Sequence, residues 1–226
     1  HWNTTTLGGP GGINIGNGAT LQIAAGGTHP LNTPLSNSGI TTWSGSPING
    51  SGTITNTSTG VLDITFTSPF GSDQNVAISN AGTLNYNAAG SWATSGSTPL
   101  LTNTGTFNIT DGGWFFGGSP FTNSGTIQVA ASKSLNFNGA AYTFGGTVIN
   151  NGSVTGTIAG FTGPAFTNNG SVTANNLPFT GAAAQTLDGT GSINTLTINN
   201  ANGVTLGGTQ TINTNLTLTS GKLDLG

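Results

Sequence analysis

The sequence predicts an all-β fold, a single-stranded parallel β-helix of the right-handed type, and three observations support this prediction. A phrase of Ser/Thr/Gly-Pro, an apolar residue and Asn-x-Gly or a close variant recurs five times, for example in the segment 119–127 (SPFTNSGTI). The phrase returns at similar intervals, as expected for a solenoid of stacked coils. No stretch shows the apolar spacing of an amphipathic helix, and 39 of the 226 residues are glycine, which disfavours helices.

The length of one coil follows from the glycines that close the full and reduced copies of the phrase. Their spacings lie between 18 and 27 residues, which predicts about 9–10 coils of about 22 residues each. The crossover rule for parallel strands favours a right-handed coil. A β-sandwich remains the alternative, because many short strands separated by turns also suit that fold. The closing glycines are Gly39, Gly60, Gly82, Gly105, Gly125, Gly152, Gly170 and Gly191.

The phrase divides the chain into a short beginning and a long repetitive part. We expect residues 1–35 to form an N-terminal cap or the first irregular coils, and residues 36–226 to form the β-solenoid repeats. The last segment, 222–226 (KLDLG), stops in the middle of the pattern. We therefore expect the repeats to continue in a longer parent protein.

Each coil can be interpreted residue by residue. Proline begins a strand, where the missing N–H costs least, and one or two apolar residues then point inward. Asn-x-Gly makes a bend, because Asn bonds its own backbone and Gly accepts a positive φ. A second strand with period two follows, as in 106–109 (TFNI) and 126–129 (TIQV), and a variable stretch completes the coil.

Stacked coils place equivalent residues one above another. The Asn of the phrase should therefore form a column whose side-chain amides bond from coil to coil. Asn150 is an alternative to its neighbour for one place in this column. The predicted column is Asn37, Asn80, Asn103, Asn123, Asn151 and Asn168.

Charged residues make up only 3% of the chain, which contains two lysines, no arginine, five aspartates and no cysteine. An average soluble domain has about 25% charged residues. Nucleic-acid binding needs clusters of Lys and Arg, so we expect no nucleic-acid partner. No apolar run reaches the ~20 residues of a membrane span, so we expect no membrane insertion. Without cysteine the chain forms no disulfide and no thiolate metal site.

Several runs resemble a known class of protein. The Asn-x-Gly-Thr-Ile runs, 193–200 (INTLTINN), 203–206 (GVTL) and 216–226 (LTLTSGKLDLG) are similar to the repetitive β-helical segments of large bacterial surface adhesins. The closest likeness is to adhesins of Bacteroidetes-type bacteria exported by type IX secretion, and haemagglutinin-like and autotransporter passengers are also similar. The resemblance covers residues 37–226. It implies a secreted or cell-surface location and the secretion machinery of the producing cell as a partner, and it brings no catalytic motif.

Ionisable residues give little support for catalysis or metal binding. Polysaccharide-degrading β-helices need grouped carboxylates, whereas the five aspartates are not spaced by whole coils, so we expect no enzyme. His1 and His29 could bind copper together, but a tag or processing remnant is the favoured interpretation of His1. We expect no cofactor, and one calcium ion held by a loop aspartate and carbonyls remains open.

Aromatic residues give the most specific candidate for a binding site. Trp92 and Trp114 are 22 residues apart, one coil, and should therefore stack. With Tyr86 and Phe116 nearby, they are candidates for a platform that stacks on a sugar ring. The alternative, which we favour, is a purely structural role in which these rings fill the core under a longer loop.

Outward threonines such as Thr106 and Thr126 suggest a more remote function, ice binding by a flat array. Such an array needs Thr-x-Thr in every coil, and 84–86 (LNY) and 127–129 (IQV) interrupt it. Thr also suits any solvated strand.

The leading functional hypothesis is a non-enzymatic β-solenoid that acts as a stalk or adhesin segment of a large secreted bacterial protein. Its uncharged amide and hydroxyl surface would contact glycans or another cell or abiotic surface. The alternative is a carbohydrate-binding module that uses Trp92 and Trp114. An ice-binding protein and a polysaccharide-degrading enzyme are remote alternatives.

Overall fold

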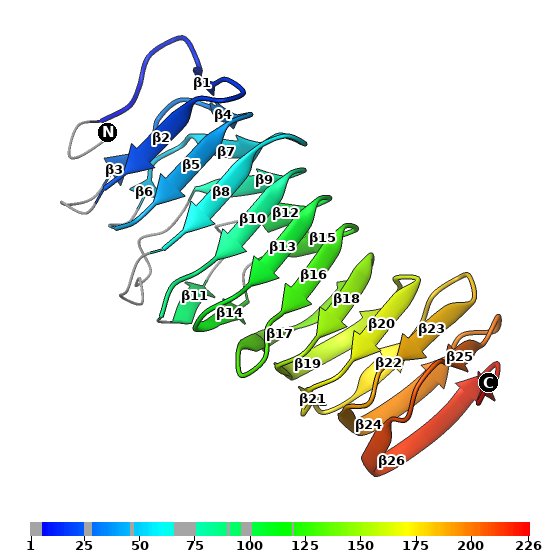
Figure 1. The fold of residues 1–226 in the computed structure, drawn as a ribbon. Coiled ribbons are helices and arrows are strands. Elements are labelled where there is room, and N and C mark those ends of the chain that lie inside the picture. The colour runs from blue at the N-terminus through cyan, green and yellow to red at the C-terminus, as the bar shows by residue number, and fades with distance from the viewer. Residues whose placement is uncertain are drawn as a thin grey trace.

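The computed structural model is a rod of stacked coils and describes residues 6–24, 29–45, 48–65, 76–89, 91–95, 101–118 and 120–226, of which 91–95, 139 and 140 are described by their backbone alone. All pairings between the described strands are parallel, and the described residues contain no helix. The chain winds as a right-handed β-solenoid of about 9 turns with ~20 residues per turn (Figure 1). The predicted fold class is confirmed, and the β-sandwich alternative is wrong because its sheets would need antiparallel neighbours.

Three long sheets run along the rod, and the second faces the viewer in Figure 1. The first sheet contains β1 (Ile13–Ile15), β4 (Leu35–Asn37), β7 (Thr53–Asn56), β9 (Ala77–Asn80), β12 (Leu101–Asn103) and β15 (Phe121–Asn123). The second contains β2 (Thr20–Ile23), β5 (Ile40–Trp43), β8 (Val61–Ile64), β10 (Thr83–Tyr86), β13 (Thr106–Ile109), β16 (Thr126–Val129), β18 (Thr147–Asn150), β20 (Ala165–Asn168), β23 (Gln185–Asp188), β25 (Val204–Leu206) and β27 (Leu223–Asp224).

The third sheet contains β11 (Ser91–Ser95), β14 (Gly113–Gly117), β17 (Ser134–Phe144), β19 (Ser153–Phe161), β21 (Ser171–Val172), β22 (Leu177–Phe179), β24 (Ser192–Asn199) and β26 (Thr211–Ser220). A two-stranded sheet pairs β3 (His29–Pro30) with β6 (Ile48–Asn49). Because β1 and β2 pair in register with the strands of the next coil, the described part of residues 1–35 already belongs to the solenoid.

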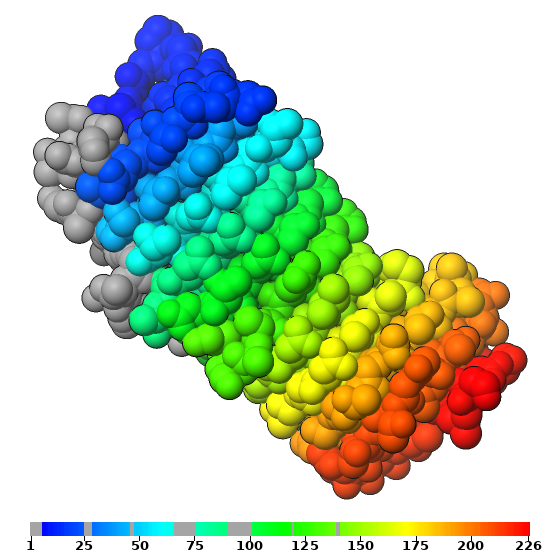
Figure 2. All heavy atoms as spheres, in the orientation of Figure 1, coloured from blue at the N-terminus to red at the C-terminus, as the bar shows by residue number. Residues whose placement is uncertain are grey.

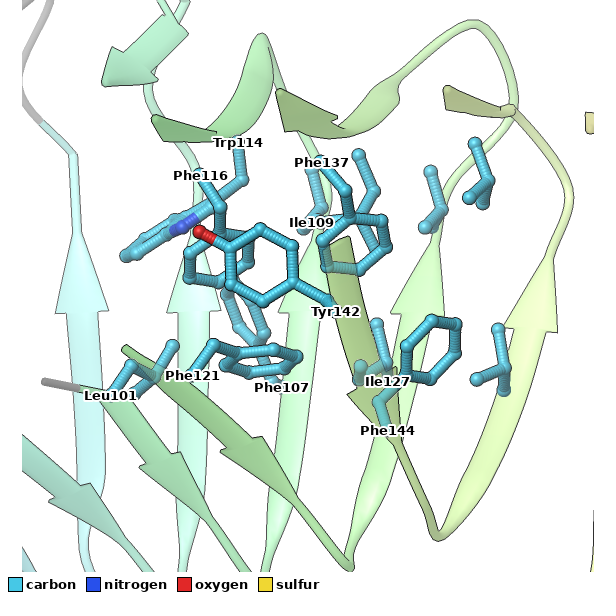
Figure 3. Packing of buried hydrophobic residues seen from close by; sticks show 14 of the residues in the cluster. Leu101, Phe107, Ile109, Trp114, Phe116, Phe121, Ile127, Phe137, Tyr142 and Phe144 are labelled. Atoms are coloured by element: carbon cyan, nitrogen blue, oxygen red, sulfur yellow. The ribbon is translucent and has the colours of Figure 1, made fainter. Parts of the chain in front are cut away.

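Side chains alternate between the inside and the outside of the rod, as period-two strands require. In β8, Leu62 and Ile64 are buried, whereas Val61 and Asp63 lie half-buried on the outer surface. The same alternation in every coil produces one continuous apolar core along the rod. Figure 3 shows part of this core, where aromatic and aliphatic side chains from successive coils fill the interior.

The predicted Asn column exists at the bend between the first and second sheets, which we call the first corner. The Nδ2 of every column member except the last, Asn123, donates to the Oδ1 of the Asn in the next coil, for example from Asn80 to Asn103 over 2.7 Å. The same Nδ2 groups also donate to backbone carbonyls of the bend, so each buried amide holds two coils together. The first-corner column consists of Asn37, Asn56, Asn80, Asn103 and Asn123.

The observed column differs from the predicted one at two residues. Asn56 belongs to it, although its closing glycine, Gly60, follows four positions later rather than two. Asn151 does not, because it is exposed and its neighbour Asn150 is the buried residue. The column begins at Asn37, whose Oδ1 has no donor among the described residues. The preceding coil supplies Ile15 at that place instead of an amide.

The phrase changes its place in the coil between Gly125 and Gly152. In β18, Asn150 pairs with Val129 and not with Asn123. The copies at 150–154 and 168–172 therefore form the bend between the second and third sheets, which we call the second corner. Asn150 donates to Asn168 across 2.8 Å, so a second amide column starts here. Asn168 is in a column as predicted, but this column is at a different corner.

Aromatic residues replace the amides at the first corner in these later coils. The Gly145 N–H donates to the carbonyl of Asn123, which places Phe144 above Asn123. In register above it follow Phe161, Phe179, Ile198 and Leu218, of which the first three are buried. The first-corner position is thus an amide in the earlier coils and apolar in the later ones.

The closing glycines serve close packing between coils rather than a positive φ, which corrects the prediction. None of the eight glycines that close the phrase has a positive φ. A Cβ on Gly105 would lie 2.2 Å from the carbonyl oxygen of Gly82, and one on Gly125 would lie 2.1 Å from that of Gly105. The backbones of successive bends approach so closely that only hydrogen fits between them.

Candidate functional site

The aromatic residues predicted as a sugar-stacking platform lie in the core. Trp114, Tyr86 and Phe116 are each 1% exposed. The Trp114 ring packs edge-on against Tyr86 and against Phe107, with ring centroids 5.3 and 4.8 Å apart. Figure 3 shows Trp114 and Phe107 in the core. Each such pair stabilises the fold by about 0.5–1.5 kcal/mol beyond the buried area. No sugar can reach the faces of these three rings. The prediction of a sugar-stacking platform is therefore wrong for them, and the alternative, a role in the core, is confirmed.

Trp92 is the fourth residue of the predicted platform. Its backbone in β11 pairs with Trp114 in β14, so the predicted stacking of these two positions is confirmed. The side chain of Trp92 lies outside the described residues, and its role in sugar binding stays a prediction. Within β14, Phe115 points away from the core while Trp114 and Phe116 point into it. Any β-strand shows this alternation, but residues 114–116 belong to the variable stretch of the coil, for which the sequence predicts no inward or outward side.

The aspartates that the structure describes make contacts within the rod and do not gather. Asp63 accepts a hydrogen bond from Asn85 Nδ2 over 2.7 Å, and Asp188 accepts one from the Gly189 N–H over 2.7 Å. Asp111 forms an ion pair with Lys133 at 2.5 Å. Asp224 forms one with Lys222 at 3.0 Å. Asp73 lies outside the described residues.

The candidate copper ligands are only partly visible. His29 is buried, and its Nε2 lies 2.7 Å from the carbonyl oxygen of Ala24, while His1 lies outside the described residues. Among the residues that the structure describes, no three His, Cys, Asp or Glu side chains lie close enough to hold one metal ion.

Within the described part of the chain, three ionisable groups have shifted pKa values. The hydrogen bond from Lys133 holds the pKa of the Asp111 carboxyl below its ordinary value, and the Gly112 N–H adds to this effect. Lys222 lowers the pKa of Asp224 in the same way, with help from the Gly226 N–H. Burial raises the pKa of the Tyr142 phenol, although a hydrogen bond from the Gly118 N–H opposes the shift.

The outer surface of the second sheet, which faces the viewer in Figure 2, presents two rows of side chains along the rod. In the first row, four successive strands place threonines in register, and Val61 and Ala165 flank them. Most side chains of the second row carry an amide or a hydroxyl, and two carry a carboxylate. The four threonines are Thr83, Thr106, Thr126 and Thr147. The second row is Gln22, Thr42, Asp63, Asn85, Asn108, Gln128, Ile149, Thr167 and Asp188.

This arrangement changes the basis of the ice-binding alternative. The interruption predicted at 84–86 is present, but it is due to Asn85 alone, because Leu84 and Tyr86 point into the core. The row of threonines is regular over four strands, but in these strands the second row carries Asn85, Asn108, Gln128 and Ile149 rather than Thr. The surface is thus a mixed hydroxyl and amide face.

A hollow of about 320 Å³ opens at the edge of this face, where the second sheet reaches the second corner. Its lining combines four polar side chains with a small apolar part and contains no charged residue. No pattern in the sequence predicted it, because it depends on the register of three successive coils. The lining residues are Asn108, Ile109, Thr110, Gln128, Val129, Ala130 and Asn151.

Comparison with known proteins adds no further constraint on this site. No protein-family model, no curated protein and no solved structure matches the chain. Among the described residues, no helix has the length and apolar character needed to cross a membrane.

Proposed function

We propose that this chain is a non-enzymatic, extracellular or cell-surface β-solenoid that acts as a stalk or adhesive segment of a large secreted bacterial protein. The rod supports the stalk part of this proposal. Each coil bonds its neighbours through parallel ladders and a shared core, so stiffness is distributed along the whole length. The resemblance of 193–226 to bacterial surface repeats supports export.

The observation that carries the adhesive part is the outer face of the second sheet. This face extends over eleven strands, and hydroxyls and amides supply most of its polarity, with Asp63, Asp188 and Asp224 as its carboxylates. Its rows of Thr, Asn and Gln offer hydrogen-bond donors and acceptors side by side, as an uncharged hydroxylated surface requires. Glycans and other uncharged cell or abiotic surfaces are the partners that this chemistry suits.

Contact through an uncharged face should be insensitive to salt, because there are few charges to screen. The test measures retention of the purified chain on polysaccharide-coated and hydroxylated silica surfaces at low and at about 1 M NaCl. We expect equal retention at both concentrations. Retention that disappears in high salt, or no retention on any surface, would contradict the adhesive part.

A pair of variants assigns the contact to one face. Thr106→Lys with Thr126→Lys places two charges in the middle of the second sheet and should reduce retention. Asn138→Lys with Thr173→Lys changes two exposed residues on the side of the third sheet and should leave retention unchanged. Equal loss in both variants would mean that the second sheet is not the contact face.

Surface location has its own test on intact producing cells. Immunodetection of the chain before and after protease treatment should show a signal that protease removes. A signal that appears only after the cells are broken would contradict the proposed location.

A further inference from the structure

The number of residues in the second corner changes from coil to coil beside the hollow. Three residues connect Ile109 to Gly113, four connect Val129 to Ser134, and two connect Asn150 to Ser153, although these strand ends are in register. The four-residue connection, 130–133, contains Ser132 at φ 63, the one described residue other than glycine with a positive φ. Such a backbone costs about 1–3 kcal/mol and is often found at functional sites. The four-residue turn begins at Ala130 and the two-residue turn begins at Asn151, and both of these residues line the hollow.

A corner row of polar side chains is also interrupted at this place. Backbone hydrogen bonds connect Thr110, Ala130 and Asn151 to equivalent positions of the preceding coils, so these residues belong to one row. Thr110 donates to Asn87 Oδ1, and Asn151 Oδ1 accepts from Asn169 Nδ2 over 2.9 Å. Between these two bonded pairs lies Ala130, which has only a methyl group. The missing side chain makes room for the hollow.

The outward amide row of the second sheet ends at the same place. Asn85 Nδ2 donates to Asp63, and Asn108 Nδ2 donates to Asn85 over 2.8 Å. Gln128 occupies the next position, but its side chain is exposed and makes no hydrogen bond within the described part of the chain. The Asn108 Oδ1 therefore has no donor among the described residues.

The polar groups left over around the hollow are complementary to hydroxyl groups. Asn108 Oδ1 offers an acceptor, Asn151 Nδ2 offers a donor, and the Gln128 amide offers both. The Ala130 methyl gives an apolar patch against which C–H groups can pack. The lining is uncharged, and its size is at the lower end of the 300–1,000 Å³ typical of ligand sites.

We propose that this hollow binds one neutral sugar unit of a glycan. The sugar hydroxyls would bond to Asn108, Gln128 and Asn151, and a C–H face would lie on Ala130. The site deepens the adhesive part of the proposed function and rests on it, since it gives the uncharged face one point of specific contact. It does not involve the aromatic residues of the core.

The test titrates neutral monosaccharides and their β- and α-linked oligosaccharides, one at a time, into the intact chain and follows amide resonances by NMR. Saturable shifts should appear at residues lining the hollow. Ala130→Thr restores the row of polar side chains and fills the hollow, and Gln128→Ala removes a free amide. Each should weaken binding by at least about tenfold, the loss expected for one or two hydrogen bonds to an uncharged partner.

A matched control lies in the same outward row of the first coil. Gln22→Ala removes the same type of side chain away from the hollow and should leave the affinity unchanged. Thermal unfolding of all three variants confirms that they fold. Sugar binding that Ala130→Thr and Gln128→Ala leave intact would overturn the proposal, as would stronger binding of an anionic probe such as inorganic phosphate.

Failure of this site and failure of the proposed function give different results. If no neutral sugar binds but the chain is still retained on polysaccharide surfaces in a salt-insensitive way, the hollow is not a sugar site and the adhesive face remains. If retention is also absent, the adhesive part of the proposed function fails as well.

Discussion

The earlier and later coils of the rod treat the same bend in different ways. From β4 to β15, a buried Asn holds the first corner by hydrogen bonds to its own bend and to the next coil. From β17 onward, Phe144, Phe161 and Phe179 occupy that position and pack on one another, with neighbouring ring centroids 5.7 and 5.2 Å apart. A bend in a solenoid therefore needs either a fully bonded amide or a well-packed ring, and one chain can change from one to the other.

In the later coils the buried amide lies at the second corner instead of the first. In the coils where the first corner is apolar, Asn150 and Asn168 bond at the second corner, and Gln210 extends that column with a bond of 2.9 Å to Asn168. The third-sheet strands lengthen at the same point, since β17 has 11 residues and β14 has 5. Gly152 and Gly170 now approach the neighbouring backbone closely at the second corner, while Gly146 and Gly163 continue the close approach at the first corner.

The largest effect should come from the glycine where the two regions meet. Gly146 has φ +73, and a Cβ there would lie 1.9 Å from the carbonyl oxygen of Gly125. Gly146→Ala combines a strained φ with backbone overlap and should cost about 5 kcal/mol of unfolding free energy. Chemical denaturation measures this loss. The control Gly16→Ala, where a Cβ has nothing within 4 Å, should stay within about 0.5 kcal/mol.

A truncated ring in the later coils should have the next largest effect. Phe161 is fully buried and contacts Phe144, Phe166 and Phe179. Phe161→Ala should reduce the unfolding free energy by about 3–5 kcal/mol, through lost apolar burial and the cavity that remains. Thr143→Ala, on the exposed side of β17, serves as control. A loss below about 1 kcal/mol would show that the aromatic column is not what holds the later coils.

An amide removed from the earlier coils should cost somewhat less. Asn103→Ala removes the acceptor of Asn80 Nδ2 and the donor to Asn123 Oδ1 and to the Thr126 carbonyl. Leaving such buried groups unpaired should cost about 2–3 kcal/mol in denaturation. Asn151→Ala, at the exposed position first assigned to this column, should cost less than about 0.5 kcal/mol. Equal losses at the two positions would deny the column any special role.

Double variants distinguish the two mechanisms further. Asn80→Ala with Asn103→Ala should cost less than the two single losses together by at least about 0.5 kcal/mol, because one bond is counted in both. Asn103→Ala with Phe161→Ala should be additive, since three coils of about 4.8 Å separate the two residues along the rod. Coupling between the distant pair would mean that the rod does not behave as a chain of neighbouring coils.

The sequence was sufficient for the fold because a stacked fold repeats its requirements. The recurring bend and the lack of helical periodicity predicted parallel coils, and the Asn of the phrase predicted a buried column. The move of the buried Asn from the first corner to the second was not predicted, because the sequence Asn-x-Gly-Ser/Thr is the same at both bends. One signal was available: Gly146-Thr147-Val148 follows Gly125-Thr126-Ile127 by 21 residues, one coil, without an Asn two residues before the glycine.

The candidate site was harder to predict than the fold. The period-two pattern of β14 places Trp114 and Phe116 on one side, but only the closed cross-section of the coil shows that this side is the inside. The hollow was invisible for a different reason. It arises from a missing side chain at Ala130, and such a gap exists only relative to neighbours one coil away in each direction.

The smallest predicted effect concerns the second corner, where the earlier and later coils differ in their electrostatic interactions. The earlier coils use the Lys133–Asp111 ion pair there, and the later coils use the buried Asn150–Asn168 bond. Lys133 lowers the pKa of Asp111 in the folded chain, so the pair stabilises the fold above the ordinary carboxyl pKa near 3.8, and this contribution is lost as the pH falls through the lowered value. Asp111→Asn should therefore reduce the denaturation midpoint slightly at pH 6 and not in strong acid.

Because both side chains are partly exposed, high salt should weaken this pair and leave the amide bond of the later coils unaffected. Lys133→Gln should reproduce the midpoint change of Asp111→Asn at pH 6, and about 1 M NaCl should reduce both changes. Asn150→Ala should lower the midpoint by a larger amount that depends on neither salt nor pH between 3 and 8, because an uncharged buried amide has nothing to titrate. A salt-dependent loss in Asn150→Ala would show that the two corners are stabilised by the same interaction after all.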